Sequence, residues 1–370
     1  MIVDCNRKEF LDAVALAASP ATSRATTLSL LKSLLLEAKE GRLRITGCDG
    51  EMWVERTIPT MVSTEGAIAL DARLLLDILG SLPDGDVHLE QPSGSSNVMI
   101  SIGQSDYRVV GMPPEDFPAI PTLSPEAELS MKAADFVGMV DSVQFAIAED
   151  KQGRAALTGV LFDYDGDILR TVATDTHRLA LRRAAFPGIG STVTAIVPGR
   201  AINIIRKLPV AEDGELRLTF GGGRLGVEGD GVRLVSQLIS GQFPPFERVI
   251  PSETTRKWMM DRDTFKDCLR RCSVLAKENS QRVVFKSDGD IVTLMARSEG
   301  VGEVKEEMSV VKEGEDVEIA FNGQYVLDSL DPIVGDGVVL QMTENDRAAV
   351  IKPSEDDVEY LCVVMPMALA

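Results

Sequence analysis

The sequence has 370 residues, of which 44% are hydrophobic and 26% charged, enough for two or three domains with packed cores. A formal net charge of −19 at pH 7 argues for solubility and against a surface covered with cationic nucleic-acid-binding side chains. Five scattered cysteines favour reduced thiols over a disulfide framework. With no apolar leader and no apolar run of about 20 residues, we expect a soluble, cytoplasmic protein.

Taken in chain order, the predicted elements come in three similar sets. Each set opens on a polar cluster, a Phe and an amphipathic helix; the Phe residues lie 126 and 129 residues apart, at Phe10, Phe136 and Phe265. A second helix begins about halfway through each set, at intervals of 127 and 124 residues, after Asp71, Pro198 and Asn322. A proline-containing segment closes each set, at intervals of 126 and 122 residues, at Pro118, Pro244 and Pro366. Three landmarks that recur in step indicate an internal repeat.

Alternating segments between the helices predict antiparallel strands joined by turns rich in Gly, Asp and Asn. Examples are residues 41–59, 166–184 and 289–310. Each repeat is therefore predicted to be α+β, with two helices on one side of an antiparallel sheet. Linkers rich in Pro, Ser and Thr place the domain boundaries at 1–122, 123–252 and 253–370.

One short motif, TVATDTHRLAL at residues 171–181, contains one of the two histidines of the chain. Asp175 and His177 alternate along it, so on an extended segment they would face the same way, as two members of a hydrolase site could. No Gly-x-Ser-x-Gly nucleophile motif accompanies them. A structural strand and turn is the favoured interpretation, and a hydrolase using these two residues is an alternative.

Three other patterns resemble nucleotide or metal sites, but each has a simpler structural explanation. The glycine motif is followed by strands and not by a helix, the acidic cluster lacks the downstream Glu of a calcium loop, and the cysteine pair lies on an apolar helix face. The residues concerned are Gly221, Gly223 and Gly226; Asp163, Asp165 and Asp167; and Cys268 and Cys272. We predict no metal and no cofactor.

Four motifs stand in the corresponding repeats: TVATDTHRLAL, GQFPPFERVIP, FNGQYVLDSL and VVMPMALA. With these motifs and its threefold repeat, the sequence resembles the bacterial DNA polymerase III beta subunit, or sliding clamp, over its whole length. The resemblance implies the DNA clamp fold and a head-to-tail homodimer that closes into a ring around duplex DNA. It implies a processivity factor without catalysis. The implied partners are the replicative polymerase, the clamp loader and repair or translesion polymerases, which dock through a short linear motif.

The resemblance also implies a pocket that receives this motif. Its residues would be Leu157, Thr174, His177, Arg178, Leu179, Pro244, Arg248, Val249, Asn322, Tyr325, Val363, Val364, Met365, Pro366 and Met367. Members of the family often have Gly where Thr176 stands, some have Phe where Ser280 stands, and many end on Arg-Leu where this chain has Ala368, Leu369 and Ala370. Apolar pockets with Met and Pro suit several unrelated peptides.

Basic residues on helices and loops are the candidates for contact with DNA. The resemblance points to Arg24, Lys151 and Arg154, while Arg200 and Lys207, and likewise Lys266 and Arg270, fall on shared helix faces. For the dimer contact the candidates are Tyr107 and Val109 on one side and Val274 and Leu275 on the other. A protein-binding scaffold without a DNA role is the second alternative.

Overall fold

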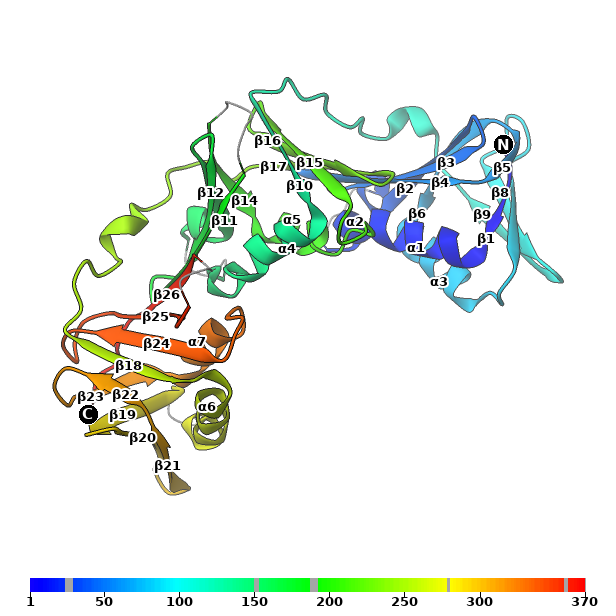
Figure 1. Ribbon diagram of the computed structural model, residues 1–370. Helices are drawn as coiled ribbons and strands as arrows, with labels where there is room; N and C mark the ends of the chain where they lie inside the picture. Colours follow the sequence, from blue (N-terminus) through cyan, green and yellow to red (C-terminus); the bar gives the residue numbers. More distant parts are fainter. Residues whose placement is uncertain (24–28, 150–152, 187–191, 278–279, 356–358, 370) are drawn as a thin grey trace. The chain divides into compact units, whose positions relative to one another are not determined.

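The computed structural model describes residues 1–23, 29–149, 153–186, 192–277, 280–355 and 359–369, and all structural statements concern these residues. It confirms the threefold repetition, because the order strand, helix, three strands, strand, helix, three strands recurs, with one additional short strand before the second helix region in the first and third repeats (Figure 1). The elements of the first repeat are β1 (Ile2–Asn6), α1 (Arg7–Ala17), α2 (Ser19–Ser23), β2 (Ser33–Lys39), β3 (Arg42–Cys48), β4 (Met52–Pro59), β5 (Met61–Thr64), β6 (Gly66–Asp71), α3 (Ala72–Ser81), β7 (Asp86–Glu90), β8 (Asn97–Ile102) and β9 (Ser105–Val110).

The second repeat follows the same order with a shorter pair of helices. Its elements are β10 (Ala127–Lys132), α4 (Ala133–Asp141), β11 (Gly159–Tyr164), β12 (Ile168–Thr174), β13 (Arg178–Ala185), β14 (Val193–Pro198), α5 (Gly199–Ile205), β15 (Glu215–Gly221), β16 (Arg224–Gly229) and β17 (Val232–Gln237). Three short 3₁₀ turns accompany them: η3 (Gln144–Ala146), η5 (Ala155–Leu157) and η6 (Phe246–Arg248).

The third repeat contains the longest helix of the described chain. Its elements are β18 (Arg256–Asp261), α6 (Arg262–Ala276), β19 (Arg282–Asp288), β20 (Ile291–Ser298), β21 (Gly302–Ser309), β22 (Val311–Glu313), β23 (Glu318–Asn322), α7 (Gly323–Leu330), β24 (Gly337–Met342), β25 (Ala349–Pro353) and β26 (Tyr360–Val364).

Side-chain caps begin four of the helices. The side chains of Asn6, Asp71, Asp261 and Asn322 accept hydrogen bonds from the first free backbone N–H groups of α1, α3, α6 and α7. Asp71 and Asn322 stand where the sequence predicts a helix start. The opening Phe residues also behave as expected, because Phe10, Phe136 and Phe265 are buried. In the third repeat Phe285 packs edge-on against Phe265, with ring centroids 6.1 Å apart.

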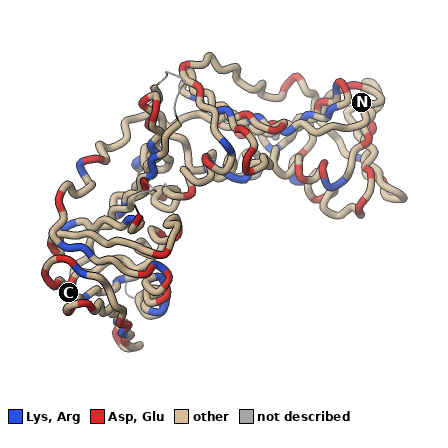
Figure 2. The backbone as a smooth tube through the Cα atoms, in the orientation of Figure 1, with Lys and Arg blue, Asp and Glu red and all other residues tan. Residues whose placement is uncertain are grey.

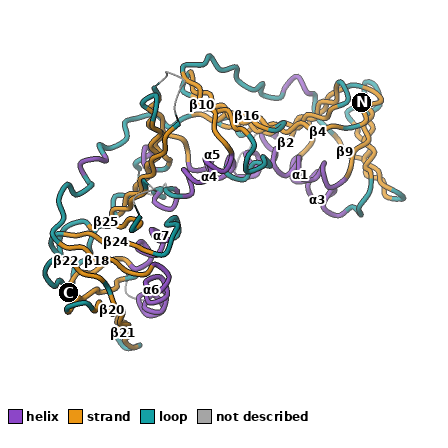
Figure 3. Tube along the Cα trace, viewed as in Figure 1, coloured by secondary structure: helices purple, strands orange, loops and turns teal. Residues whose placement is uncertain are grey.

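By its internal contacts the chain forms two compact units, Met1–Phe136 with Arg200–Leu238, and Val137–Gly199 with Ile239–Ala370. The first unit holds a five-stranded sheet in the order β5-β1-β7-β8-β9 and an eight-stranded sheet in the order β10-β15-β16-β17-β4-β3-β2-β6. Within this unit α1 and α3 lie on the same side of the eight-stranded sheet (Figure 3). The large sheet is continuous because β17 of the second repeat pairs antiparallel with β4 of the first.

The second unit is built in the same way. It holds a nine-stranded sheet in the order β14-β11-β12-β13-β26-β25-β24-β18-β22 and a four-stranded sheet in the order β21-β20-β19-β23. Here β13 of the second repeat pairs antiparallel with β26 of the third, with Leu179 opposite Val363. This pairing brings the TVATDTHRLAL segment and the C-terminal segment together.

Candidate partner-binding pocket and nucleic-acid interface

The turn between β12 and β13 is fixed by its own side chains. Asp175 accepts hydrogen bonds through Oδ1 from the backbone N–H groups of His177 (2.9 Å) and Arg178 (3.0 Å). The Thr174 hydroxyl donates to the Arg178 carbonyl at 2.7 Å. Thr176 has φ +79°, in the left-handed region that β-branched residues rarely adopt. The turn is therefore rigid and locally strained at Thr176.

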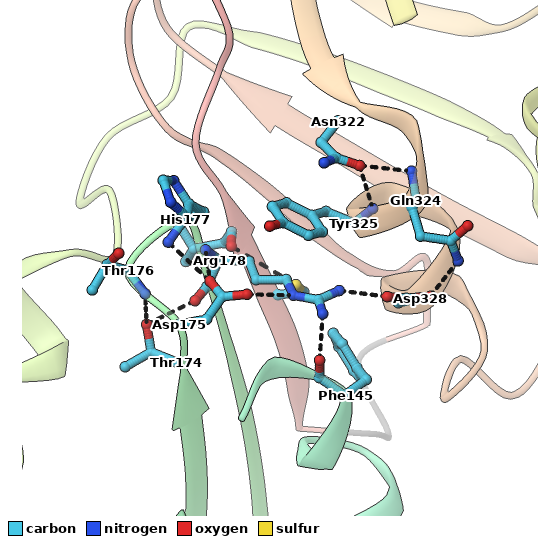
Figure 4. A network of polar contacts seen from close by, with 12 residues as sticks. Phe145, Thr174, Asp175, Thr176, His177, Arg178, Asn322, Gln324, Tyr325 and Asp328 are labelled. Atoms are coloured by element: carbon cyan, nitrogen blue, oxygen red, sulfur yellow. Dashed lines mark hydrogen bonds and ion pairs between the residues drawn. The ribbon is translucent and has the colours of Figure 1, made fainter. Parts of the chain in front are cut away.

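Arg178 lies at the centre of a polar network (Figure 4). Its guanidinium donates to Asp175 Oδ2 (3.0 Å), to Asp328 Oδ2 on α7 (2.5 Å) and to the Phe145 carbonyl on η3. The Tyr325 ring covers it, with Arg178 Cζ 4.3 Å from the ring centroid. Only 10% of the Arg178 side chain is exposed. It connects the turn to the third repeat and presents little surface to a ligand.

Tyr325 completes this arrangement. Burial, followed by the nearby Asp175 carboxylate, raises the pKa of Tyr325, because both favour the neutral hydroxyl. The exposed His177 ring stacks on the Tyr325 ring, with centroids 6.4 Å apart and an angle of 27° between planes. The ring of His177 thus faces an aromatic side chain, while the Asp175 carboxylate is occupied by backbone N–H groups and Arg178.

Beside this network is a mainly apolar cavity of about 510 Å³. Eight of the predicted pocket residues line it: Leu157, Thr174, Arg178, Leu179, Pro244, Val249, Val363 and Met365. Five more lining residues are Arg154, Ala156, Thr176, Gln242 and Phe246. None of these five is among the pocket residues that the resemblance implies. Arg154, a candidate DNA contact, also lies in the cavity wall.

The other predicted pocket residues lie around the cavity without lining it. Asn322 caps α7 through its side chain. Val364 is buried in the core of the third repeat, on the opposite face of β26 from Val363. The Met367 backbone N–H donates to the Ala320 carbonyl at 2.7 Å. Residues outside the lining are His177, Arg248, Asn322, Tyr325, Val364, Pro366 and Met367.

The candidate DNA contacts differ in how free their charges are. Arg24 and Lys151 lie outside the described residues. Arg200 donates to the buried carboxylate of Asp49 at 2.5 Å. The side chain of Lys207 is exposed. Arg200 therefore has a structural role in the first unit that the sequence pattern did not reveal.

On α6, positive charges alternate with negative ones (Figure 2). Lys266 forms an ion pair with Asp331, and Arg270 pairs with Asp267 at 3.3 Å. The Arg270 side chain is 59% exposed, whereas that of Lys266 is 20% exposed. Exposed pairs of this kind exchange readily for other anions, so Arg270 remains available to a phosphate.

The candidate dimer residues lie on an edge strand of the first repeat and on a helix of the third. Tyr107 and Val109 are on β9, the edge strand of the five-stranded sheet, and their side chains face the core, where Val109 is only 6% exposed. On α6, Val274 is 69% exposed and Leu275 is half-buried. These placements leave the strand edge of β9 and the apolar side chain of Val274 accessible.

Three family models of the DNA polymerase III beta subunit match consecutive parts of the chain: the N-terminal domain at residues 1–121, the central domain at 130–245 and the C-terminal domain at 247–368. The chain belongs to this family. A curated beta sliding clamp from Staphylococcus aureus is 29% identical over 347 residues, covering 91% of this chain and 92% of that protein.

Solved structures of the DNA polymerase III beta family agree with this assignment. The beta subunit from Thermotoga maritima is 26% identical with a TM-score of 0.91, and both chains are covered completely. A sliding clamp from Pseudomonas aeruginosa bound to griselimycin is 27% identical with a TM-score of 0.92 and the same coverage. The DNA clamp fold predicted from the sequence is confirmed.

Membership of the DNA polymerase III beta family also settles the question raised by Asp175 and His177. The family is non-catalytic, and the two side chains have other uses here, in the turn and against Tyr325. Among the described residues no group of three or more His, Cys, Asp and Glu side chains could hold a metal ion. No helix in the described part of the chain is long and apolar enough to cross a membrane.

Proposed function

We infer that this protein is a DNA sliding clamp, a processivity factor that holds the replicative polymerase on duplex DNA. The observation that carries this function is the cavity formed where β13 meets β26, in a chain that matches the DNA polymerase III beta subunit from end to end. A clamp that encircles DNA is retained by topology, so a chain with net charge −19 can hold DNA without tight phosphate binding.

The occupant of the cavity is proposed to be a short linear motif of a polymerase, clamp loader or repair protein. Leu157, Leu179 and Val363 offer buried apolar surface for hydrophobic side chains. Met365, which is 40% exposed, can adapt to different peptides. Arg154 is exposed in the wall and suits an acidic residue of the motif.

Peptide titration tests this pocket. A fluorescent peptide from a polymerase tail should lose at least tenfold in affinity when Met365→Asp or Val249→Asp puts a charge into the apolar wall. Val334→Asp is the matched control, because Val334 is 75% exposed and does not line the cavity. Equal peptide affinity for all three variants and the parent protein would contradict the proposal that the peptide binds in this cavity.

The partner in the ring is proposed to be a second copy of the chain, joined head to tail. The open strand edges support this, since β9 belongs to the first repeat and β21 to the third. The repeats themselves are proposed to extend over residues 1–122, 123–252 and 253–370. Lys207, Arg270, Arg24 and Lys151 are proposed as weak, sequence-independent DNA contacts.

Retention on circular DNA separates encirclement from surface binding. The protein is loaded on nicked plasmid by a clamp loader, washed in high salt, and the plasmid is then cut. Survival of the wash followed by release on cutting is expected, because salt screens phosphate contacts but does not open a ring. Loss in the wash, with the loader proven active on another clamp, would favour a protein-binding scaffold without a DNA role.

A further inference from the structure

The two places where a sheet crosses a repeat boundary are built alike. At the first junction β4 pairs with β17, and at the second junction β13 pairs with β26. In each junction one residue has a neighbour on the preceding strand of its own repeat and another on the strand of the next repeat. The two rows are Cys48, Trp53 and Val235 at the first junction, and Thr174, Leu179 and Val363 at the second. The second row lines the partner pocket.

The backbone around the two rows has the same hydrogen bonds. Asp49 Oδ1 accepts from the backbone N–H groups two and three residues further on, at 3.0 and 2.8 Å. Asp175 Oδ1 accepts the same two bonds at 2.9 and 3.0 Å, as part of the turn in Figure 4. At both junctions the N–H two residues beyond Val235 or Val363 donates to the carbonyl two residues beyond that aspartate, at 2.8 and 2.9 Å. Position by position, the two junctions are therefore equivalent.

The segments that cover the two rows correspond as well. Three residues that line the cavity together with Leu179 are Leu157, Pro244 and Phe246. The residues 126 positions earlier, the interval that also separates Trp53 from Leu179, are Leu31, Pro118 and Ile120. Leu31 and Ile120 pack against the buried cluster that contains Trp53. The first junction therefore has walls that match those of the partner pocket.

The first junction differs in the side chain at its centre. Trp53 stands where the second junction has Leu179, and only 8% of Trp53 is exposed. Its indole Nε1–H donates to the Pro118 carbonyl at 3.2 Å, and its ring belongs to one buried cluster with Cys48 and Phe117. A buried tryptophan offers a large apolar surface and requires an acceptor for its N–H. The walls of the first junction supply both.

We infer that the first junction is a second copy of the partner pocket, closed by the side chain of Trp53. The indole occupies the space that corresponds to the cavity of about 510 Å³ at the second junction. That the open copy receives a partner's peptide rests on the proposed function. Trp53 thereby keeps such peptides out of the first junction. Once vacated, this site takes a planar aromatic group with an N–H that donates to the Pro118 carbonyl.

Removal of the indole should open the first junction. Trp53→Ala leaves a cavity that the surrounding strands close only in part. Calorimetric titration with indole should therefore show one more bound indole per chain for Trp53→Ala than for the parent protein. The probe 1-methylindole has no N–H for the Pro118 carbonyl, so it should bind the added site several-fold more weakly. Equal stoichiometry for variant and parent, or equal binding of the two probes, would overturn the inference. Trp53→Leu, a smaller change, repeats the test if Trp53→Ala does not fold.

The reciprocal change should close the second junction. In Leu179→Trp the new indole takes the position that Trp53 has at the first junction, so affinity for the polymerase-tail peptide should fall at least tenfold. The urea midpoint of the second unit should stay close to that of the parent, because the indole fills an existing cavity. Leu181→Trp is the matched control, since Leu181 lies on the same face of β13, is 1% exposed and does not line the cavity. Overpacking there should lower the midpoint by about 0.5 M or more.

Fluorescence in a Trp53→Phe background follows these midpoints, because every tryptophan that remains lies in the second unit. A midpoint for Leu179→Trp as low as that for Leu181→Trp would overturn the equivalence of the two junctions. Unchanged peptide affinity in a folded Leu179→Trp would do the same. Failure of the parent protein to bind any polymerase peptide would instead contradict the proposed function. The indole titration of Trp53→Ala would then still decide whether Trp53 closes a pocket, since it involves no peptide.

Discussion

Removal of the Arg178 guanidinium should destabilise the second unit far more than removal of an ordinary surface charge. In Arg178→Ala the carboxylates of Asp175 and Asp328, which are 14% and 23% exposed, lose the cation that both contact. Breaking a buried ion pair by removing one partner costs about 3–5 kcal/mol. Because Asp328 retains some contact with water, we expect the lower end, about 3 kcal/mol.

Urea unfolding followed by tryptophan fluorescence can isolate this effect. The chain has two tryptophans, Trp258 in the second unit and Trp53 in the first. In a Trp53→Phe background, Trp258, which is fully buried, reports on the second unit alone. With a slope of about 2–3 kcal/mol per molar urea, the midpoint for Arg178→Ala should fall by about 1 M or more.

The matched control is Lys286→Ala, which removes a cation from an exposed cross-strand pair of the same unit. Lys286 Nζ lies 3.4 Å from Glu318, and the two side chains are 55% and 45% exposed. Such pairs contribute about 0–1 kcal/mol. Equal midpoints for Arg178→Ala and Lys286→Ala would refute the conclusion that Arg178 is a buried structural connection.

Three further outcomes are expected. Replacement of Thr176 by Gly should raise the free energy of unfolding by about 0.5–1 kcal/mol in the same urea assay, because Gly accepts a positive φ, and a lower midpoint would contradict the strain. Burial raises the pKa of the Cys362 thiol to about 12, so a disulfide reagent at pH 8 should leave it unmodified until denaturant is added. The Ile168 N–H and Arg170 lower the pKa of Asp165 to about 2 from 3.8, so its contribution to stability is present above pH ~4 and is lost as the pH falls towards ~2. The stability difference between the parent and Asp165→Asn should narrow over that window in acid titrations, and a constant difference would argue against it.

Local patterns in the sequence predicted the elements because their causes are local. Asp71 and Asn322 cap helices through bonds that reach only two or three residues along the chain. Phe10, Phe136 and Phe265 are buried because an amphipathic helix has one apolar face. The alternation along a strand likewise anticipates that neighbouring residues of β26 face opposite ways.

The functions of charged side chains were harder to predict, because they depend on residues that are distant in the sequence. Arg200 shared a helix face with Lys207, but its partner Asp49 is 151 positions away. The sequence predicts Arg154 in a loop that contacts DNA, and only the fold around η5 shows that it also lies beside Leu157 in the cavity wall. Phe246 could not be predicted as a pocket residue, because its segment has no regular periodicity.

Because two of the sheets continue across the repeat boundaries, the cooperative units of the protein do not coincide with its sequence repeats. The central repeat contributes β10 and β15–β17 to one unit and β11–β14 to the other. These two parts should open and exchange their amide hydrogens with different neighbours. β10 and β15–β17 should do so with the N-terminal repeat, and β11–β14, which lie between them in the sequence, with the C-terminal repeat. An excised central repeat would expose two long strand edges at once, so evolution can lengthen or shorten the array only by changing two junctions together.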